Sequence, residues 1–432
     1  MTSMTADELV VAEPARFWSR PRKVGAGFVA AGVIAAALFG SLATDRPARL
    51  TLAETTAGAA VGINGTVGAI VFGLLAALAG GALLAGVGGP TVHRGRWFGA
   101  LLGAGIVGIV LSFLCWQISQ APEGLNVMPL GDVTRSSLLL ALPLIFGSLS
   151  GLLCERSGII NVAIEGQFLM GAFGAALGAT VAGSVWVGVG AAAAGGVVVA
   201  AILAVLAIRY LVDQIVLGIV LNVFALGLTG FLYEQIMSRD QSSYNQPDPA
   251  PVWTVPGLSQ IPVLGPLLFK ANFFVYAALA LVVILHFGLR RTRWGLRTRA
   301  VGEHPAAADT VGIKVLALRY RNVLLAGVIA GLGGGYFTLL STTNFNKGMT
   351  GGAGFIALAA MIFGRWNPVG ALVASLFFGF ANALAFFLGA IASPIPNQFL
   401  NMLPYLATIV AVAGLVGKVR PPAAEGKPYV KG

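Results

Sequence analysis

Long apolar runs without charged side chains recur along this chain and restrict its fold more than any other feature. A helix needs about 20 apolar residues to cross a hydrocarbon core, and only helices or closed barrels satisfy every backbone polar group in lipid. Barrel strands alternate apolar and polar side chains, whereas these runs are apolar on every face. The sequence therefore predicts an all-α polytopic integral membrane protein with roughly 10 to 12 transmembrane helices. We expect spans near residues 26–43, 57–89, 97–119, 136–153, 159–183, 185–208, 213–236, 272–289, 322–343, 353–364, 367–391 and 397–417.

Composition excludes a water-soluble enzyme. Hydrophobic residues make up 57% of the 432 positions and charged residues only 10%, against about 25% charged residues in an ordinary soluble domain. The chain carries 27 Lys and Arg against 16 Asp and Glu, a net charge of +11. Because the cations lie between the apolar runs, we interpret them as signals of membrane orientation and expect no nucleic-acid partner.

The distribution of these cations predicts which loops face the cytoplasm. If the N-terminus lies in the cytoplasm, the cytoplasmic segments are the two tails and the loop after every second span. These segments contain all but six of the 27 Lys and Arg residues. The asymmetry follows the positive-inside rule and places both termini in the cytoplasm. The six outside cations are Arg46, Arg49, Arg135, Arg239, Lys270 and Lys347.

Spans and loops divide the chain into four parts. The first apolar run follows a cluster of cations, as in a signal peptide, but it exceeds the usual apolar length of about 7 to 15 residues, so we expect a retained helix. The parts are a cytoplasmic tail (1–25), N-terminal transmembrane helices without an assigned role (26–130), a core (131–417) and a second cytoplasmic tail (418–432).

Two runs have lengths that do not suit one straight span. The run 57–89 is too long, and Gly62-Ile63-Asn64-Gly65 is expected to interrupt it. The run 353–364 reaches only about 18 Å as a helix. We expect a half-helix or a re-entrant segment there, and such broken helices often line transport sites.

Two loops are long enough to have a role of their own. Residues 237–271, assigned to the outside, contain six prolines, which favours a stiff loop that is either a simple connector or a docking platform for an external partner. Residues 290–321 form the longest and most basic inside loop. Its cations either only hold it at the membrane surface, or a short helix starting at Pro305 and ending near Gly312 projects into a groove on another subunit.

Three stretches resemble one family of transporters. Residues 290–321 resemble the coupling region of ABC-importer permeases, with Ala306 at the position of their Glu. Over residues 136–430 the chain is similar to the bacterial nucleoside and simple-sugar permeases of the branched-chain amino acid and ribose permease superfamily. The stretches that carry this resemblance are CERSGIINVAIEG (154–166), RAVGEHPAAADTVGI (299–313) and GFIALAAMIFGRWNPVG (354–370).

The resemblance implies partners and a site of contact with them. It implies a second permease subunit, two cytoplasmic ABC ATPase subunits and an extracytoplasmic substrate-binding lipoprotein, with this chain surrounded by lipid in the bacterial cytoplasmic membrane. The residues implied to contact the ATPase are Gly302, Glu303, Ala307, Ala308, Asp309 and Gly312.

Catalysis by this chain is not expected. The sequence lacks a Gly-x4-Gly-Lys-Ser/Thr loop for nucleotide phosphates, so we expect no bound cofactor here and place ATP and Mg on the partner ATPase. The three histidines are scattered, without the neighbours that a metal site or a catalytic triad needs.

A few polar and aromatic residues inside the spans are candidates for a substrate path. Glu165 either caps a helix or pairs with Arg156, or it contacts substrate or gates the path. The amides join helices or read base edges, and the aromatic rings pack or stack on a nucleobase. The candidate path consists of Asn161, Glu165, Phe168, Asn222, Phe224 and Asn382.

The mechanism expected from these features is transport. The segments after Gly158 and Gly354 are alike and run in opposite directions in the predicted topology, the arrangement of an inverted repeat with substrate at its interface. We predict the permease subunit of an ABC importer for nucleosides. The alternatives are a permease for ribose-like simple sugars and, more distantly, an ion-coupled secondary transporter.

Overall fold

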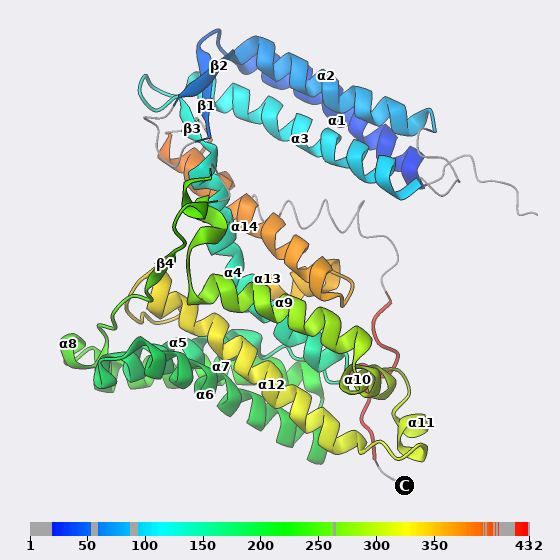
Figure 1. Cartoon of the computed structure of the whole chain (residues 1–432), viewed down its shortest axis with the longest axis vertical. Coiled ribbons are helices and arrows are strands. Elements are labelled where there is room, and N and C mark those ends of the chain that lie inside the picture. The colour runs from blue at the N-terminus through cyan, green and yellow to red at the C-terminus, as the bar shows by residue number, and fades with distance from the viewer. Residues whose placement is uncertain are drawn as a thin grey trace, which may run out of the picture. The chain divides into compact units, whose positions relative to one another are not determined.

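The structure is a computed structural model that describes residues 20–52, 59–86, 94–261, 265–391, 393, 395–400, 402, 405 and 420–430. The described parts form two compact units (Figure 1). Unit 1 consists of Met1–Pro129 and Leu388–Pro396, and unit 2 of Leu130–Phe387 and Asn397–Gly432.

Ten helices in the described ranges are long and apolar enough to cross a membrane. This confirms the prediction of an all-α polytopic membrane protein, and most of the span expected at 397–417 lies outside the described residues. The ten are Pro21–Leu42, Gly65–Leu84, Trp97–Gln120, Leu130–Glu155, Ile164–Ala182, Val185–Arg209, Gln214–Met237, Phe273–Arg291, Val315–Ser341 and Pro368–Ala390.

Unit 1 packs three helices together and adds a small sheet. In the sheet, β1 lies between β2, which is antiparallel to it, and β3, which is parallel. The long run predicted at 57–89 is broken where its glycines suggest, because the strand β2 ends at Asn64 and that side chain accepts a hydrogen bond from the backbone N–H of Val67 (3.1 Å) to cap the next helix. The elements are α1 (Arg20–Leu42), β1 (Pro47–Thr51), β2 (Ala60–Asn64), α2 (Gly65–Leu84), α3 (Arg94–Gln120) and β3 (Val127–Pro129).

Unit 2 is built around one buried helix, α4 (Leu130–Glu155), whose apolar stretch is 89% buried. The helix α7 (Gln214–Leu232) is far more exposed, at 33% buried for its stretch, and offers an apolar outer face. Around α4 lie α5 (Ile164–Ala182), α6 (Val185–Ala204), α9 (Phe273–Arg291), α12 (Val315–Tyr336), α13 (Ala353–Phe363) and α14 (Pro368–Ala390, in this unit up to Phe387), with π-helical turns at Val205–Arg209, Tyr233–Met237 and Phe337–Ser341.

Two helices of unit 2 begin inside the helix bundle, each after a non-helical segment. Residues 156–163 return from the end of α4 before α5 begins, and residues 342–352 precede α13, which has only 11 residues. The prediction of a half-helix near 353–364 is therefore confirmed. A Cβ atom on Gly147 of α4 would meet both Ile164 and Ala357. Both helices therefore start beside the middle of α4 and not beyond its end.

Both long loops of unit 2 contain regular structure. The proline-rich loop contains α8 (Gln241–Tyr244), a 3-10 turn (Leu258–Gln260), a π-helical turn (Gly265–Phe269) and the antiparallel pair β4 (Val252–Thr254) and β5 (Lys270–Asn272). The basic segment expected as a loop at 290–321 is mostly helical, with α10 (Arg293–Glu303) and α11 (Pro305–Thr310) before α12 begins at Val315. We call residues 290–321 the basic hairpin.

Glycines allow α5, α6 and α12 to approach backbone to backbone. A Cβ atom on Gly196 of α6 would lie 2.6 Å from Cα of Gly331 on α12, and one on Gly171 of α5 would lie 2.9 Å from the same atom. Helices pack this closely in lipid only where side chains are small.

We expect Gly196→Ala to destabilise the protein by about 1–3 kcal/mol, because the added methyl group overlaps the backbone of α12. Gly190→Ala on the same helix is the matched control, since nothing lies within 4 Å of the Cβ position there. Thermal unfolding of both variants in detergent measures the difference. Equal stability of the two variants would show that α6 and α12 are not in close contact.

Candidate functional site

The starts of the two broken helices are joined by one carboxylate. Glu165, in the first turn of α5, accepts hydrogen bonds at Oε1 from the Thr350 hydroxyl (2.6 Å) and the Gly352 backbone N–H (2.8 Å). Its Oε2 accepts from the N–H of Gly354 (2.7 Å). A helix N-terminus carries unpaired N–H groups and a partial positive charge, so Glu165 acts as the cap of α13. The expected pairing with Arg156 is wrong, since that guanidinium donates instead to the carbonyl of Trp366.

Buried amides satisfy the backbone at the start of α5. Asn222 of α7 accepts from the N–H of Gly166 (2.8 Å) and donates to the carbonyl of Val162 (2.9 Å). Asn161 and Gln167 exchange hydrogen bonds of 3.1 and 3.3 Å between their side chains, and both are fully buried. The non-helical segment before α5 therefore has polar partners inside an apolar bundle.

The structure brings together some of the predicted path residues but not all. Asn161, Glu165 and Asn222 meet around the start of α5, and Phe168 is buried beside them with its ring 6.1 Å from that of Phe337. Phe224 is 49% exposed on the outer face of α7. Asn382 is half-buried on α14, a helix that packs on α4. A role of these residues in substrate passage stays a prediction.

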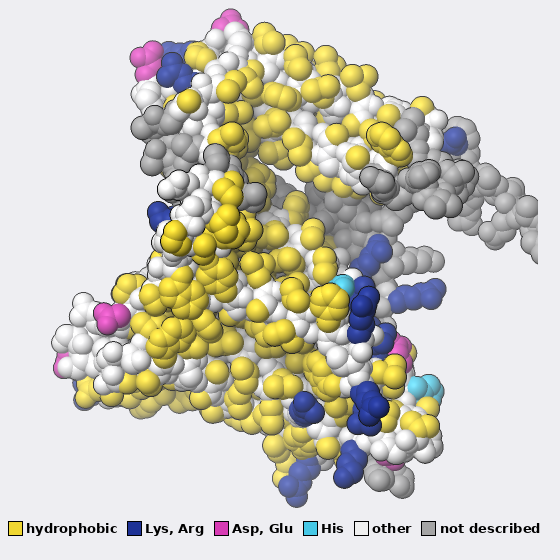
Figure 2. Space-filling view, in the orientation of Figure 1, with side chains coloured by type: hydrophobic (Ala, Val, Ile, Leu, Met, Phe, Trp, Pro, Cys, Tyr) yellow, Lys and Arg dark blue, Asp and Glu magenta, His cyan; other side chains and the backbone are white. Residues whose placement is uncertain are grey.

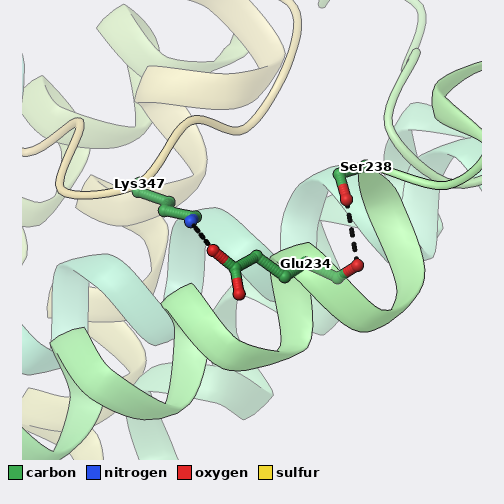
Figure 3. A network of polar contacts seen from close by, with 3 residues as sticks. All are labelled: Glu234, Ser238 and Lys347. Atoms are coloured by element: carbon green, nitrogen blue, oxygen red, sulfur yellow. Dashed lines mark hydrogen bonds and ion pairs between the residues drawn. The ribbon is translucent and has the colours of Figure 1, made fainter.

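The loop that precedes α13 is fixed at its other end by charged and polar contacts. Lys347 forms an ion pair with Glu234 in the π-helical turn that follows α7, and the Ser238 hydroxyl donates to the Glu234 carbonyl at 2.9 Å (Figure 3). The Asn245 side chain accepts a hydrogen bond from the N–H of Phe345 (2.6 Å) and donates one to the carbonyl of Phe345 (2.9 Å). The segment 342–352 is therefore tied at both ends, by Lys347 and Asn245 at one and by Glu165 at the other.

The end of α4 is tied to the turn between α13 and α14. Arg156 donates to the Trp366 carbonyl from Nε (3.0 Å) and Nη2 (2.8 Å), and the Trp366 indole N–H donates to Glu155 (2.5 Å). Arg365 and Trp366 both have positive φ angles, 55° and 50°. Backbone strain of this kind persists only where surrounding contacts fix it, and here the end of α4 supplies those contacts.

Within the basic hairpin, α11 is closed by a glycine turn. The N–H of Gly312 donates to the carbonyl of Asp309 (2.9 Å), and the N–H of Ile313 donates to the carbonyl of Ala308 (3.1 Å). With Gly312 at φ +84°, these bonds form a Schellman motif, which needs glycine at this position. The expected short helix that begins at Pro305 is therefore confirmed.

The candidate contact residues of the hairpin divide into inward and outward groups. Ala308 is buried against Val301 and Val315, whereas Ala307 and Gly312 are exposed. Gly302 packs so closely on the α4–α5 turn that a Cβ atom there would lie 2.9 Å from the carbonyl carbon of Arg156. The hairpin that carries the exposed part of α11 is thus packed closely, through Gly302 of α10, on the turn before α5.

The C-terminal tail, residues 420–430, docks beside the hairpin, a contact that the sequence analysis did not predict. The N–H of Ala424 donates to the Gly302 carbonyl (2.9 Å), and the N–H of Ala423 to the Glu303 carboxylate (3.2 Å). The buried Arg319 of α12 donates to the carbonyls of Ser157 (3.1 Å) and Lys427 (3.3 Å). The tail therefore connects the hairpin, α12 and the α4–α5 turn.

Positive charge gathers at this end of unit 2. Figure 2 shows Lys and Arg side chains clustered over the part of the surface where α10 and α11 lie. A cavity of about 310 Å³ opens here, lined by Arg297, Lys314 and Arg321 together with apolar and glycine residues of the hairpin and α12. This face suits a partner that carries carboxylates.

We expect Glu165→Gln to destabilise the protein by about 1–3 kcal/mol, because the amide nitrogen would face an N–H donor of α13 and leave buried groups unpaired. Asp213→Asn is the matched control. Asp213 caps α7 at the surface through the N–H groups of Ile215 and Val216, and Asn caps equally well, so its effect should stay within about 0.5 kcal/mol. Thermal unfolding with hydrogen exchange of the α13 amides separates the two. Unchanged exchange at Gly354 in Glu165→Gln would contradict the capping role.

Comparison with known proteins places the chain in a family. Residues 133–413 match the family described as branched-chain amino acid transport system, permease component. The guanosine ABC transporter permease NupQ of Bacillus subtilis is 41% identical over 318 residues, which cover 71% of this chain and 98% of NupQ. The nucleoside ABC transporter permease NupC of Lactococcus lactis is 39% identical over 69% of this chain and 96% of NupC.

A further relative is named for another substrate, and no solved structure shows a significant match. The putative glucose ABC transporter permease TsgC13 of Haloferax volcanii is 31% identical over 62% of this chain and 87% of TsgC13. The chain is therefore a multi-pass membrane protein that belongs to the permease-component family of branched-chain amino acid transport systems.

Proposed function

We propose that this chain is the permease subunit of an ABC importer that moves nucleosides across the bacterial cytoplasmic membrane. The observation that carries this is the similarity at about 40% identity to two nucleoside permeases, each covered over nearly its whole length. The cluster of Asn161, Glu165 and Asn222 where two broken helices start supports it, because transporters commonly place substrate at such ends.

The distribution of charge supports an orientation with both termini in the cytoplasm. The basic hairpin then faces inward, and the ATPase subunits that bind ATP and Mg contact α11. The structured loop with β4 and β5 faces outward, where a substrate-binding lipoprotein docks. A second permease subunit completes the transmembrane pathway, and this chain itself catalyses no reaction.

The contacts described above supply a mechanical route from α11 to the candidate path. Force on α11 reaches the turn after α4 through the packing of Gly302 on Arg156. The residues that follow this turn lead directly to the start of α5, where Glu165 holds α13. Movement of the hairpin therefore changes how the two broken helices meet, and so biases the pathway between its two openings.

Reconstitution tests the proposed substrate and energy source. The full chain, with the second permease, the ATPase subunits and the binding lipoprotein of the same host, should move radiolabelled guanosine into proteoliposomes only with ATP. Competition by other nucleosides but not by glucose is expected, while competition by glucose or ribose alone would support a sugar permease. Uptake by this chain alone under a proton gradient would refute the proposal.

We expect Gly312→Val to lose nearly all ATP-driven uptake while the protein still inserts in the membrane. A β-branched residue at φ +84° costs about 1–2 kcal/mol or more and reshapes the end of α11. Gly86→Val is the matched control, because Gly86 has φ +86° and, like Gly312, nothing within 4 Å of its Cβ position. It should keep most of its uptake. Normal uptake by Gly312→Val would remove α11 as the coupling element.

A further inference from the structure

The tail and the hairpin form one continuous surface outside the membrane-spanning segments. Tyr429 packs against the cluster of Val301, Ala308 and Val315, and burial together with the neighbouring Asp309 carboxylate of α11 raises the pKa of its hydroxyl. Tyr429 and α11 are more than a hundred residues apart in the sequence. The end of the tail is therefore a fixed part of the surface around α11.

Two apolar side chains project from this surface. Val311 is 75% exposed and Val430 is 70% exposed, the highest values among the large hydrophobic residues that the structure describes. Val311 follows Asp309 by two residues, and Val430 follows Tyr429 directly. Many other strongly exposed apolar residues, such as Phe386, lie on helices that cross the membrane, where lipid covers them. Val311 and Val430 lie outside those helices and next to the contact between hairpin and tail, so a protein partner that docks on this contact buries them.

The chemistry beside the two valines defines that partner. The cavity next to Gly312 is lined by Arg297, Lys314 and Arg321, and no carboxylate is among its described lining residues. A partner that covers this face therefore needs an apolar pocket for each valine and acidic side chains for the cavity.

We propose that the surface receiving the ABC ATPase subunit is composite, made by α11 together with the C-terminal tail, with Val311 and Val430 as its apolar anchors. The inference rests on the proposed function, since it assigns the tail a place in that same contact. The hydrogen bond of Ala424 to Gly302 and the packing of Tyr429 on Val301, Ala308 and Val315 place the second anchor before the partner arrives.

Cysteine labelling tests the surface directly, because the two native cysteines, Cys115 and Cys154, are buried. Val311→Cys and Val430→Cys are made in the full chain in nanodiscs, with Val61→Cys as the matched control, a valine 68% exposed on β2. Maleimide labelling is measured with and without the ATPase subunit that sustains uptake in proteoliposomes. We expect that subunit to slow labelling of both hairpin and tail cysteines by about tenfold or more, and to leave Val61→Cys unchanged.

Three other results overturn the proposal in distinguishable ways. Protection of Val311→Cys alone removes the tail from the surface and leaves the proposed function intact. Protection of neither cysteine in a preparation that still transports refutes docking at α11 as well. If both cysteines are protected without the ATPase subunit, and protection rises with the permease concentration, the surface contacts a second copy of this chain.

A second variant separates contact from positioning. Val430→Asp keeps Tyr429 and its packing on Val301, Ala308 and Val315, so the tail stays docked while a carboxylate replaces the apolar anchor. We expect the Kd for the ATPase subunit to rise about tenfold, and Val61→Asp to bind like the unmodified chain. An unchanged Kd for Val430→Asp overturns the proposal.

Discussion

The carboxylate of Glu165 accepts hydrogen bonds from the backbone N–H groups at the start of α13, and the arrangement of unit 2 depends on this contact. A helix that begins inside an apolar bundle leaves backbone N–H groups without water, and each unpaired group is costly. Glu165 supplies the missing acceptor for α13, and Asn222 does the same for Gly166 at the start of α5. Because Gly354 has no side chain, the two helix starts come close enough for these short side chains to reach. Both helices can therefore start beside the middle of α4 without an unpaired polar backbone.

From this junction, contacts lead without interruption to the surface of the hairpin. The segment between α4 and α5 has Glu165 at its far end and Arg156 at its near end, where Gly302 packs on it. Arg156 also holds the strained turn at Trp366, which closes α13. The segment before α5 and the helix α13 are thus each anchored once at the junction and once at the end of α4 near the hairpin. A displacement of the hairpin acts on both helices together, as expected of a two-state pathway and not of a local hinge.

Sequence patterns predicted the helices of this protein better than their contacts. Length and hydropathy were sufficient for the spans, for the short α13 and for α11 with Gly312 at its end, since each depends on local chain properties. The partner of Glu165 was missed because its donors, from Thr350 to Gly354, lie almost 190 residues away. Membrane helices are apolar on every face, so periodicity did not indicate that Phe224 points outward while Asn222 points toward α5. The stretches 154–166 and 354–370, alike in family resemblance, turn out to touch each other.

Docking of the tail on the hairpin also has a cost. Its docking buries Nη2 of Arg319 and Oε2 of Glu425 without a hydrogen-bond partner among the described residues. It also places the Glu425 carboxyl beside Glu155, and burial raises the pKa of Glu425. Unpaired buried polar groups oppose the backbone bonds that the tail makes. The hairpin has a similar cost, because Nε of Arg299 on α10 is also buried without a partner among the described residues. At α11 itself the Schellman motif satisfies the last carbonyls. A partner that covers α11 and the tail stabilises the docked tail by binding it.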